Sequence, residues 1–327
     1  MTVAIAQLNS ALLEAKAAFF QKNGYVIFEQ AVSHQLIHEF AEEFHRLTAA
    51  NKPLKVNLLG EITSFADADS AQREKLIRYG RFTDIEVHSE LGKQLILHPV
   101  VSQFLTRIYQ TNKPTSLQSL TYKYSSQQGE HSDLYLVSPD WAGEYDRNYL
   151  AASWIALEDA SSSNGALIIY PKSHLIPNKK RLDRDFKNNY GEYVAYCKDI
   201  CAQHGIEPQY FQARKGDILF WHGDFIHAGG EVQNWGQTRF SIVCHYANID
   251  PDHFPLSLAN FRCYRDRILY QDLGYFYRDL PSRHLRRDLL KLWDDVLIKQ
   301  HRTRVKIALA RHKTKKALKK ALGFQTK

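Results

Sequence analysis

The segment from residue 151 to residue 171, AASWIALEDASSSNGALIIYP, decides the fold class. Two apolar runs stand on either side of a polar stretch that ends in Asn164 and Gly165, a pair typical of tight turns. Similar short runs, each bounded by turn-forming residues, occur at 119–124, 216–221 and 239–246. Strands of this length with frequent turns favour a mainly β, antiparallel double sheet of the jelly-roll or cupin type, in which alternate side chains line the interior.

The regions around these strands have helical character. Apolar periodicity predicts helices up to about residue 22 and at about 34–50 and 92–110, with an apolar strand at 24–29. The polar segment 178–206 interrupts the strands and is interpreted as an insertion over the mouth of the barrel. From about residue 255 onward the pattern is helical again. We therefore expect a mainly β domain at 1–250, which includes the helices that precede its strands, and a helical extension at 251–327.

Composition agrees with a large folded domain. The chain has 327 residues, of which 44% are apolar and 12% aromatic, enough to bury a substantial core. The start lacks a basic flank and a cleavage site, and no apolar run approaches the roughly 20 residues of a membrane span, so a cytoplasmic protein is expected. Four cysteines are too few for a disulfide framework. Cys197 and Cys201, one helical turn apart, are read as reduced structural thiols, with a metal site as the alternative.

A metal site is indicated by His131 and Asp133 in EHSDLYLVSP and by His227 in WHGDFIHAGG. Two imidazoles and one carboxylate on one face of a metal leave other positions open, which suits ferrous iron that must bind a co-substrate and dioxygen together. Arg239, 12 residues after His227, could anchor an acidic co-substrate, because a planar guanidinium binds a carboxylate through two parallel hydrogen bonds.

The His-x-acid pattern has little weight by itself, because the chain contains two other pairs of this kind, His88 with Glu90 and His222 with Asp224. Only the pair at His131 is followed by a histidine and then an arginine at suitable distances and lies in a region that reads as strand. The other two pairs are interpreted as solvated or capping residues.

Around these residues the chain resembles the phytanoyl-CoA dioxygenase family of iron and 2-oxoglutarate oxygenases over roughly residues 15 to 248. The resemblance is carried, in the family's order, by GYVIFEQAVS (24–33), SWIALEDASSSNGALIIYPKSH (153–174), KGDILFWHGDFIHAGG (215–230) and TRFSIVCHY (238–246). It implies a double-stranded β-helix core, Fe(II), 2-oxoglutarate and dioxygen as cofactor and co-substrates, and ascorbate as a reductant. Residue by residue, it implies iron ligation by His131, Asp133 and His227, a bond from Arg239 to the 2-oxoglutarate tail, and Trp154 beside the same pocket.

Further details bear on the reaction and the site. Family relatives that halogenate have a small residue at the position of Asp133, so hydroxylation is favoured here. Ser241 is two residues after Arg239, so it lies on the same face of its strand and could reach the same pocket. It could equally be a serine that faces the interior without binding a ligand. Lys172 stands where the family usually has glycine, and the loop 134–149 is long, which leaves the substrate open.

Other functions can be weighed against this one. A 2-oxoglutarate-independent, cupin-like metal-binding protein would have no reason to keep Arg239, and a catalytically dead sensor would be expected to have lost a ligand. A nucleic-acid demethylase would need a second arginine six residues after Arg239, where this chain has His245.

The substrate is expected to be a small molecule, anionic and lipid-linked ones included. Basic residues in the insertion could receive an anionic group or simply form a solvated surface: Lys179, Lys180, Arg181, Arg184 and Lys187. Fold and cofactor do not choose among substrates, and the oligomeric state is not indicated.

Basic charge is concentrated at the end of the chain. Residues 299–327 contain 11 lysines and arginines and no acid, so the net charge of +8 leaves about −3 on the rest of the protein. Apolar residues among them give a basic amphipathic helix that could lie on an anionic membrane, contact nucleic acid or an acidic protein, or pack against the domain.

If residues 299–327 hold the protein at a membrane, their deletion should abolish salt-sensitive binding to anionic vesicles and spare turnover of a soluble substrate. Each basic residue near the surface contributes about 1 kcal/mol. Vesicle co-sedimentation at low and high salt measures the effect. Equal binding by the full-length and truncated proteins would refute the role, and loss of folding would favour a self-packed helix.

Overall fold

The structure is a computed structural model that describes residues 8–50, 52–58, 60–110, 114–135, 150–248, 261–264 and 268–271. The chain divides into two compact units, the first made of Met1–Phe254 and Phe261–Gln271, the second of Pro255–Asn260 and Asp272–Lys327. All described residues belong to the first unit.

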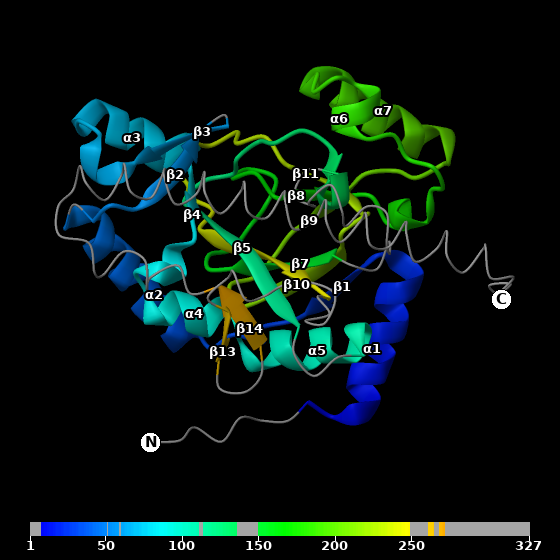
Figure 1. Cartoon of the computed structure of the whole chain (residues 1–327), viewed down its shortest axis with the longest axis horizontal. Helices are drawn as coiled ribbons and strands as arrows, with labels where there is room; N and C mark the ends of the chain where they lie inside the picture. Colours follow the sequence, from blue (N-terminus) through cyan, green and yellow to red (C-terminus); the bar gives the residue numbers. More distant parts are fainter. Residues whose placement is uncertain are drawn as a thin grey trace, which may run out of the picture. The chain divides into compact units, whose positions relative to one another are not determined.

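Two sheets form the centre of this unit (Figure 1). The larger sheet contains β1 (Tyr25–Phe28), β2 (Lys55–Leu58), β3 (Glu61–Ser64), β4 (Arg81–Thr83), β5 (Thr115–Tyr122), β7 (Leu150–Ala156), β10 (Ile218–His222), β12 (Ser241–Ala247), β13 (Phe261–Tyr264) and β14 (Ile268–Gln271). The smaller sheet contains β6 (His131–Ser132), β8 (Leu167–Ile169), β9 (Gln209–Phe211) and β11 (Ile226–Gly229). Their orders are β1-β10-β7-β12-β5-β4-β2-β3, with β14 joined to β5, and β6-β11-β8-β9. The predicted antiparallel double sheet is thus confirmed.

Successive side chains of the strands in the larger sheet pack into two separate hydrophobic cores, one on each face. On β7, Trp154 packs in a cluster with Leu167 and Ile169 of the smaller sheet, so this cluster fills the space between the sheets. The next residue, Ile155, belongs instead to a cluster shared with the helices. Because successive side chains point to opposite faces of a strand, every second residue of the larger sheet reaches the interior, where a site can be built.

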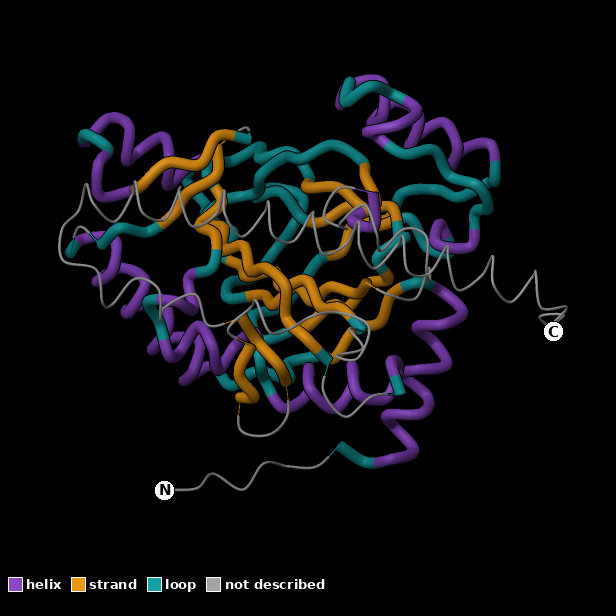
Figure 2. The backbone as a smooth tube through the Cα atoms, viewed as in Figure 1, coloured by secondary structure: helices purple, strands orange, loops and turns teal. Residues whose placement is uncertain are grey.

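Helices cover the outer face of the larger sheet (Figure 2). They are α1 (Ser10–Asn23), α2 (His34–Ala49), α3 (Ser70–Tyr79), α4 (Glu90–Ile96) and α5 (Pro99–Tyr109). Helix α2 begins where the Ser33 side chain accepts a hydrogen bond from the Leu36 N–H, and its buried face is Ile37, Phe40, Phe44 and Leu47. None of the helices that the structure describes is long and apolar enough to cross a membrane.

Two helix predictions need correction. The helix expected at 92–110 is two helices, because Pro99 begins α5 and holds His98 in an extended conformation. The helix expected from 255 onward is wrong for residues 261–264 and 268–271, which form β13 and β14. Their sequences, FRCY and ILYQ, are rich in aromatic and β-preferring residues, and β14 pairs with β5. The rest of that extension, including the basic tail, lies outside the described residues.

The insertion at 178–206 forms α6 (Leu182–Asp185) and α7 (Tyr190–Gln203) beside the smaller sheet (Figure 1). Cys197 and Cys201 on α7 are buried, free thiols that pack with Ile226 of β11. Burial raises the pKa of each thiol to about 12, so both stay protonated at neutral pH. They are structural thiols, as expected.

Candidate metal centre

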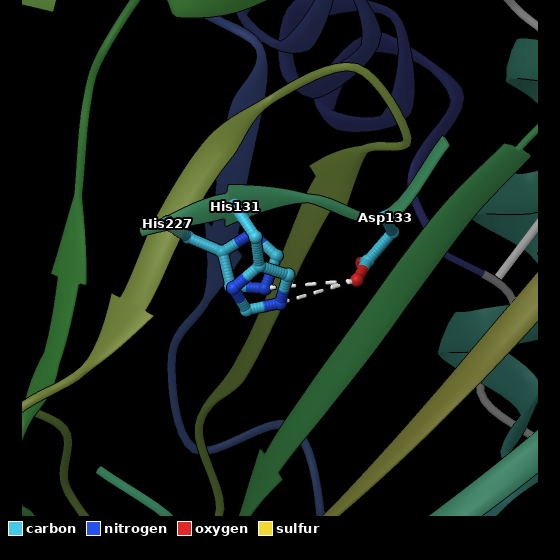
Figure 3. Close-up of side chains that lie close together, drawn as sticks. All are labelled: His131, Asp133 and His227. Atoms are coloured by element: carbon cyan, nitrogen blue, oxygen red, sulfur yellow. Dashed lines mark ion pairs between the residues drawn. The ribbon is translucent and has the colours of Figure 1, made fainter. Parts of the chain in front are cut away.

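The structure brings the three predicted ligands together. His131 lies on β6 directly opposite His227 on β11, and Asp133 follows at the start of the short 3-10 helix Asp133–Tyr135. The Asp133 Oδ1 atom lies 3.6 Å from His131 Nε2 and 3.9 Å from His227 Nε2 (Figure 3). One ligand atom from each side chain lies within 4.8 Å of the others, so the three could hold one metal ion.

Backbone carbonyls orient both imidazoles. His131 Nδ1 lies 2.7 Å from the Gly129 oxygen, and His227 Nδ1 lies 3.3 Å from the Phe225 oxygen. A proton on each Nδ1 satisfies these contacts and leaves Nε2 free as a ligand. Burial lowers the pKa of His227 to about 4, so its ring is neutral at physiological pH, as metal binding requires.

The second oxygen of Asp133 is occupied by two groups that the sequence analysis missed. Trp221 donates its indole N–H to Oδ2 at 2.6 Å, and His245 Nε2 lies 3.3 Å from the same atom. Burial acts to raise the pKa of Asp133, but its electrostatic interactions with the neighbouring imidazoles of His245, His227 and His131 outweigh burial and hold this pKa well below its usual value. The carboxylate is therefore ionised, with Oδ1 turned toward the two ligand histidines.

Strand alternation is the signal that could have found both residues. Leu219 and Val243 both belong to the cluster between the sheets. Trp221 is two residues after Leu219 and His245 is two residues after Val243, so both are expected to point into the same interior.

Arg239 is a buried cation that pairs with no acidic side chain in the described part of the chain. Its side chain is 2% exposed, its Nη1 donates to the Gly165 oxygen at 3.1 Å, and its guanidinium stands over the Trp154 ring at 5.5 Å. Burial lowers the pKa of Arg239 to about 10, so it remains charged at neutral pH. No carboxylate among the described residues pairs with it. An unpaired buried charge is costly, which indicates that an anionic ligand completes this site.

Four buried polar atoms in this region have no hydrogen-bond partner among the described residues: His245 Nδ1, Arg239 Nε, Trp154 Nε1 and Ser241 Oγ. The last three belong to the residues that were predicted from the sequence to bind the co-substrate. A carboxylate-bearing co-substrate such as 2-oxoglutarate would supply acceptors for such donors, so the donor set fits it.

Two turns of the family motif have a left-handed backbone conformation, which glycine adopts most easily. Gly165, which accepts the bond from Arg239, has φ +87°, and a Cβ there would lie 2.5 Å from Ser125 Cβ. Lys172, at the position where the family usually has glycine, also adopts a left-handed conformation with φ 70°. A non-glycine residue there costs roughly 1–2 kcal/mol, which this fold tolerates.

The other His-x-acid pairs are not metal sites. Asp224 is completely buried and forms an ion pair with Lys179 Nζ at 3.1 Å, while its backbone N–H donates to His222 Nδ1. Among the residues that the structure describes, only the group at His131 has a metal-binding arrangement.

Two of the basic residues in the insertion form ion pairs, Lys179 with Asp224 and Arg181 with Asp183. Residues 136–149 of the long loop lie outside the described part of the chain.

Comparison with known proteins identifies the family. The family model for "Phytanoyl-CoA dioxygenase (PhyH)" matches residues 20–240. The chain belongs to the phytanoyl-CoA dioxygenase family. The peroxisomal phytanoyl-CoA dioxygenases of Rattus norvegicus and Homo sapiens are 23% and 22% identical in alignments of length 259 that cover 74% of this chain and 70% of each relative.

Solved structures show the same fold. The non-heme alpha-ketoglutarate-dependent epimerase SnoN from nogalamycin biosynthesis matches with a TM-score of 0.52 and 19% identity, over 73% of this chain and 84% of SnoN. EctD from S. alaskensis with bound Fe matches with a TM-score of 0.50 and 15% identity, over 76% and 79% of the two chains. Family membership and the donor set confirm the fold and the expected Fe(II) and 2-oxoglutarate. Ascorbate stays a prediction.

The Trp221 hydrogen bond should be measurable as metal affinity. Trp221→Phe keeps an aromatic ring beside His227 but removes the donor to Asp133, so we expect Fe(II) to bind about 10- to 100-fold more weakly. Anaerobic Fe(II) titration measures this. Trp235→Phe, at a tryptophan that packs on Tyr79 and Tyr124, is the matched control. Equal affinity of the Trp221 variant and the wild type would contradict the role.

Proposed function

We propose that this protein is an Fe(II)- and 2-oxoglutarate-dependent dioxygenase that hydroxylates a small molecule, with His131, Asp133 and His227 as the metal ligands. The observation that carries the proposal is Arg239, a buried guanidinium with no described counter-charge inside the fold that holds the three ligands. A protein that bound only a metal would gain nothing from such a residue.

The chain's own residues would act mainly by binding and orientation. His131, Asp133 and His227 leave the remaining metal positions open, while Arg239 holds the distal carboxylate of the co-substrate and Trp154 and Ser241 border it. Bound Fe(II), together with 2-oxoglutarate and dioxygen, supplies an oxidant strong enough for an unactivated C–H bond. The cluster around Trp154 keeps water away from this reaction.

Hydroxylation is proposed over other outcomes because the metal site retains a full carboxylate at Asp133. The test is to incubate the iron-loaded protein with a metabolite extract of its host and to seek a product that gains one oxygen only when 2-oxoglutarate is present. A product of unchanged mass would instead indicate an isomerisation of the kind named for SnoN.

A non-catalytic or 2-oxoglutarate-independent metal-binding protein is the alternative. Anaerobic titration of 2-oxoglutarate into the Fe(II)-loaded protein separates the two, because binding of a 2-oxo acid to ferrous iron produces a visible charge-transfer band. Absence of a saturable band at full iron occupancy would favour the alternative.

We also propose that the catalytic domain corresponds to residues 1–250 with its insertion at 178–206, that 251–327 is an extension, and that residues 299–327 make peripheral contact with an anionic membrane. The run of basic residues without acids supports the last point, and the vesicle experiment above tests it.

Removing the ligand carboxylate should stop the reaction. We expect Asp133→Ala to abolish 2-oxoglutarate-dependent succinate formation while the protein stays folded, because one of three ligands and its charge are lost. Succinate release, circular dichroism and iron content are the measurements. Wild-type turnover by the variant would refute the assignment of the ligands.

Removing the buried cation should affect the co-substrate more than the metal. Arg239→Leu should raise the 2-oxoglutarate concentration for half-maximal turnover by about 30-fold or more, because losing such a pair costs roughly 2–5 kcal/mol. Iron affinity should change little. Lys123→Leu is the control, since Lys123 is already paired with Glu158 at 3.1 Å. Should the Lys123 variant show the larger shift, Arg239 is not the anchor.

A further inference from the structure

The turn between β10 and β11, residues 223–225, holds the chain on both sides of Asp133. The Gly223 oxygen accepts a hydrogen bond from the Ser132 hydroxyl at 2.9 Å and another from the Leu134 N–H at 2.7 Å. Ser132 and Leu134 are the residues immediately before and after Asp133. The position of this one carbonyl therefore limits where the ligand carboxylate can lie.

The same turn leads into the second histidine ligand. The Phe225 oxygen orients the ring of His227, whose Nδ1 lies 3.3 Å away. At the start of the turn, the Asp224 N–H donates to Nδ1 of His222 at 3.0 Å, and the Phe225 N–H donates to the His222 oxygen at 2.8 Å. These bonds close the turn, so a group that fixes the turn also fixes ligands on both β6 and β11.

A buried lysine of the insertion fixes this turn. The Lys179 ammonium forms an ion pair with Oδ1 of Asp224 at 3.1 Å, and the two side chains are 2% and 0% exposed. The same ammonium donates to the Ser173 oxygen at 2.8 Å and to the Ile176 oxygen at 3.1 Å. Because an ammonium group has three hydrogens, one lysine can join Asp224 to the bend that follows β8.

The bend after β8 is in turn bonded to β11. The Ser173 hydroxyl oxygen accepts a hydrogen bond from the Ile226 N–H at 2.7 Å, and the Tyr170 N–H donates to the Ile226 oxygen at 3.2 Å. Ile226 is the first residue of β11 and pairs with Ser132 of β6. Lys179 thus completes a closed set of bonds among the bend, the turn and the two strands that carry the histidine ligands.

A pair buried as deeply as Lys179 and Asp224 is poor evidence of added stability. Taking two charges out of water offsets much of their mutual attraction, and apolar residues of similar size can often replace such a pair without loss of stability. Apolar side chains cannot, however, direct bonds to one carboxylate and two carbonyls at fixed points. The contacts of Lys179 therefore favour a role in geometry.

We propose that Lys179 is a positioning residue of the metal centre. Through Asp224 it fixes the turn 223–225, whose carbonyls hold the chain around Asp133 and the ring of His227. This inference rests on the proposed function for the identity of the ligands, and it concerns their arrangement in space. Loss of the ion pair should loosen the metal centre while the protein stays folded.

The test removes both charges together in the full-length protein. Lys179→Met combined with Asp224→Leu leaves no buried charge behind, so it avoids the strong destabilisation expected when only one partner is removed. We expect a melting temperature close to that of the wild type. Fe(II) should nevertheless bind about 10-fold more weakly or worse in anaerobic titration, as is typical when residues that orient metal ligands are lost.

Co(II) gives a second measurement that requires neither 2-oxoglutarate nor turnover. Its visible absorption bands depend on the arrangement of the ligands, so Co(II) is added anaerobically to the iron-free protein. The double variant should show bands that differ from those of the wild type in position and intensity. A contribution of the ion pair to stability alone would leave these bands unchanged.

The matched control removes another ion pair of the insertion. Arg181→Met combined with Asp183→Leu eliminates a pair whose atoms lie 3.0 Å apart and whose side chains are 9% and 41% exposed. Fe(II) affinity and the Co(II) bands of this control should match the wild type. If the double variant at Lys179 does not fold, Lys179→Arg takes its place, since it keeps the charge but replaces the compact ammonium by a planar group. It should change affinity and bands in the same direction.

Wild-type Fe(II) affinity together with wild-type Co(II) bands in the Lys179 variant would overturn the inference. An equal change in the control would overturn it too, and failure of both Lys179 variants to fold would assign the pair to stability instead. A wild type that bound neither Fe(II) nor Co(II) would defeat the proposed function itself, which is a different result.

Discussion

The antiparallel pairing of β6 with β11 is the interaction on which the site depends. It sets His131 directly opposite His227, although the two are 96 residues apart in the chain. β6 is only two residues long, so its position relies on its neighbours, including the Ser132 hydroxyl that donates to the Gly223 oxygen at 2.9 Å. A shift of one residue in this register would turn one imidazole to the other face of the sheet and destroy the centre.

The interior between the sheets is apolar, yet it contains an ionised carboxylate and a guanidinium. Asp133 is compensated inside the protein, by the Trp221 N–H and His245 on one oxygen and by the ligand histidines on the other. Arg239 is not compensated by any described residue apart from one carbonyl and an aromatic ring. Breaking a buried charge pair costs several kcal/mol, so an unpaired buried cation is evidence of a ligand and not of stability.

The insertion contacts the segment that carries His131, and one of these contacts is made through a backbone carbonyl. The Gly129 oxygen is contacted by Tyr190 of α7 and by the ring of His131, so a change in the position of α7 alters the group that orients a metal ligand. Elsewhere, α7 is anchored by Tyr193, Cys197 and Cys201, which pack against the smaller sheet. The insertion is therefore part of the support of the metal site.

The sequence by itself determined the strand-rich fold, the ligands and Arg239, because these depend on local properties: apolar runs with turns, residue types with metal affinity, and a motif order shared with a family. The break before α5 was also visible locally in Pro99 and was overlooked. Tertiary structure alone decided which distant strands become neighbours. That pairing placed Trp221 and His245 on Asp133, and the tertiary fold buried Lys179 against Asp224, which took it out of the predicted substrate rim. None of these contacts can be read locally, because each joins residues more than 40 positions apart in the chain or depends on the register of a strand pair.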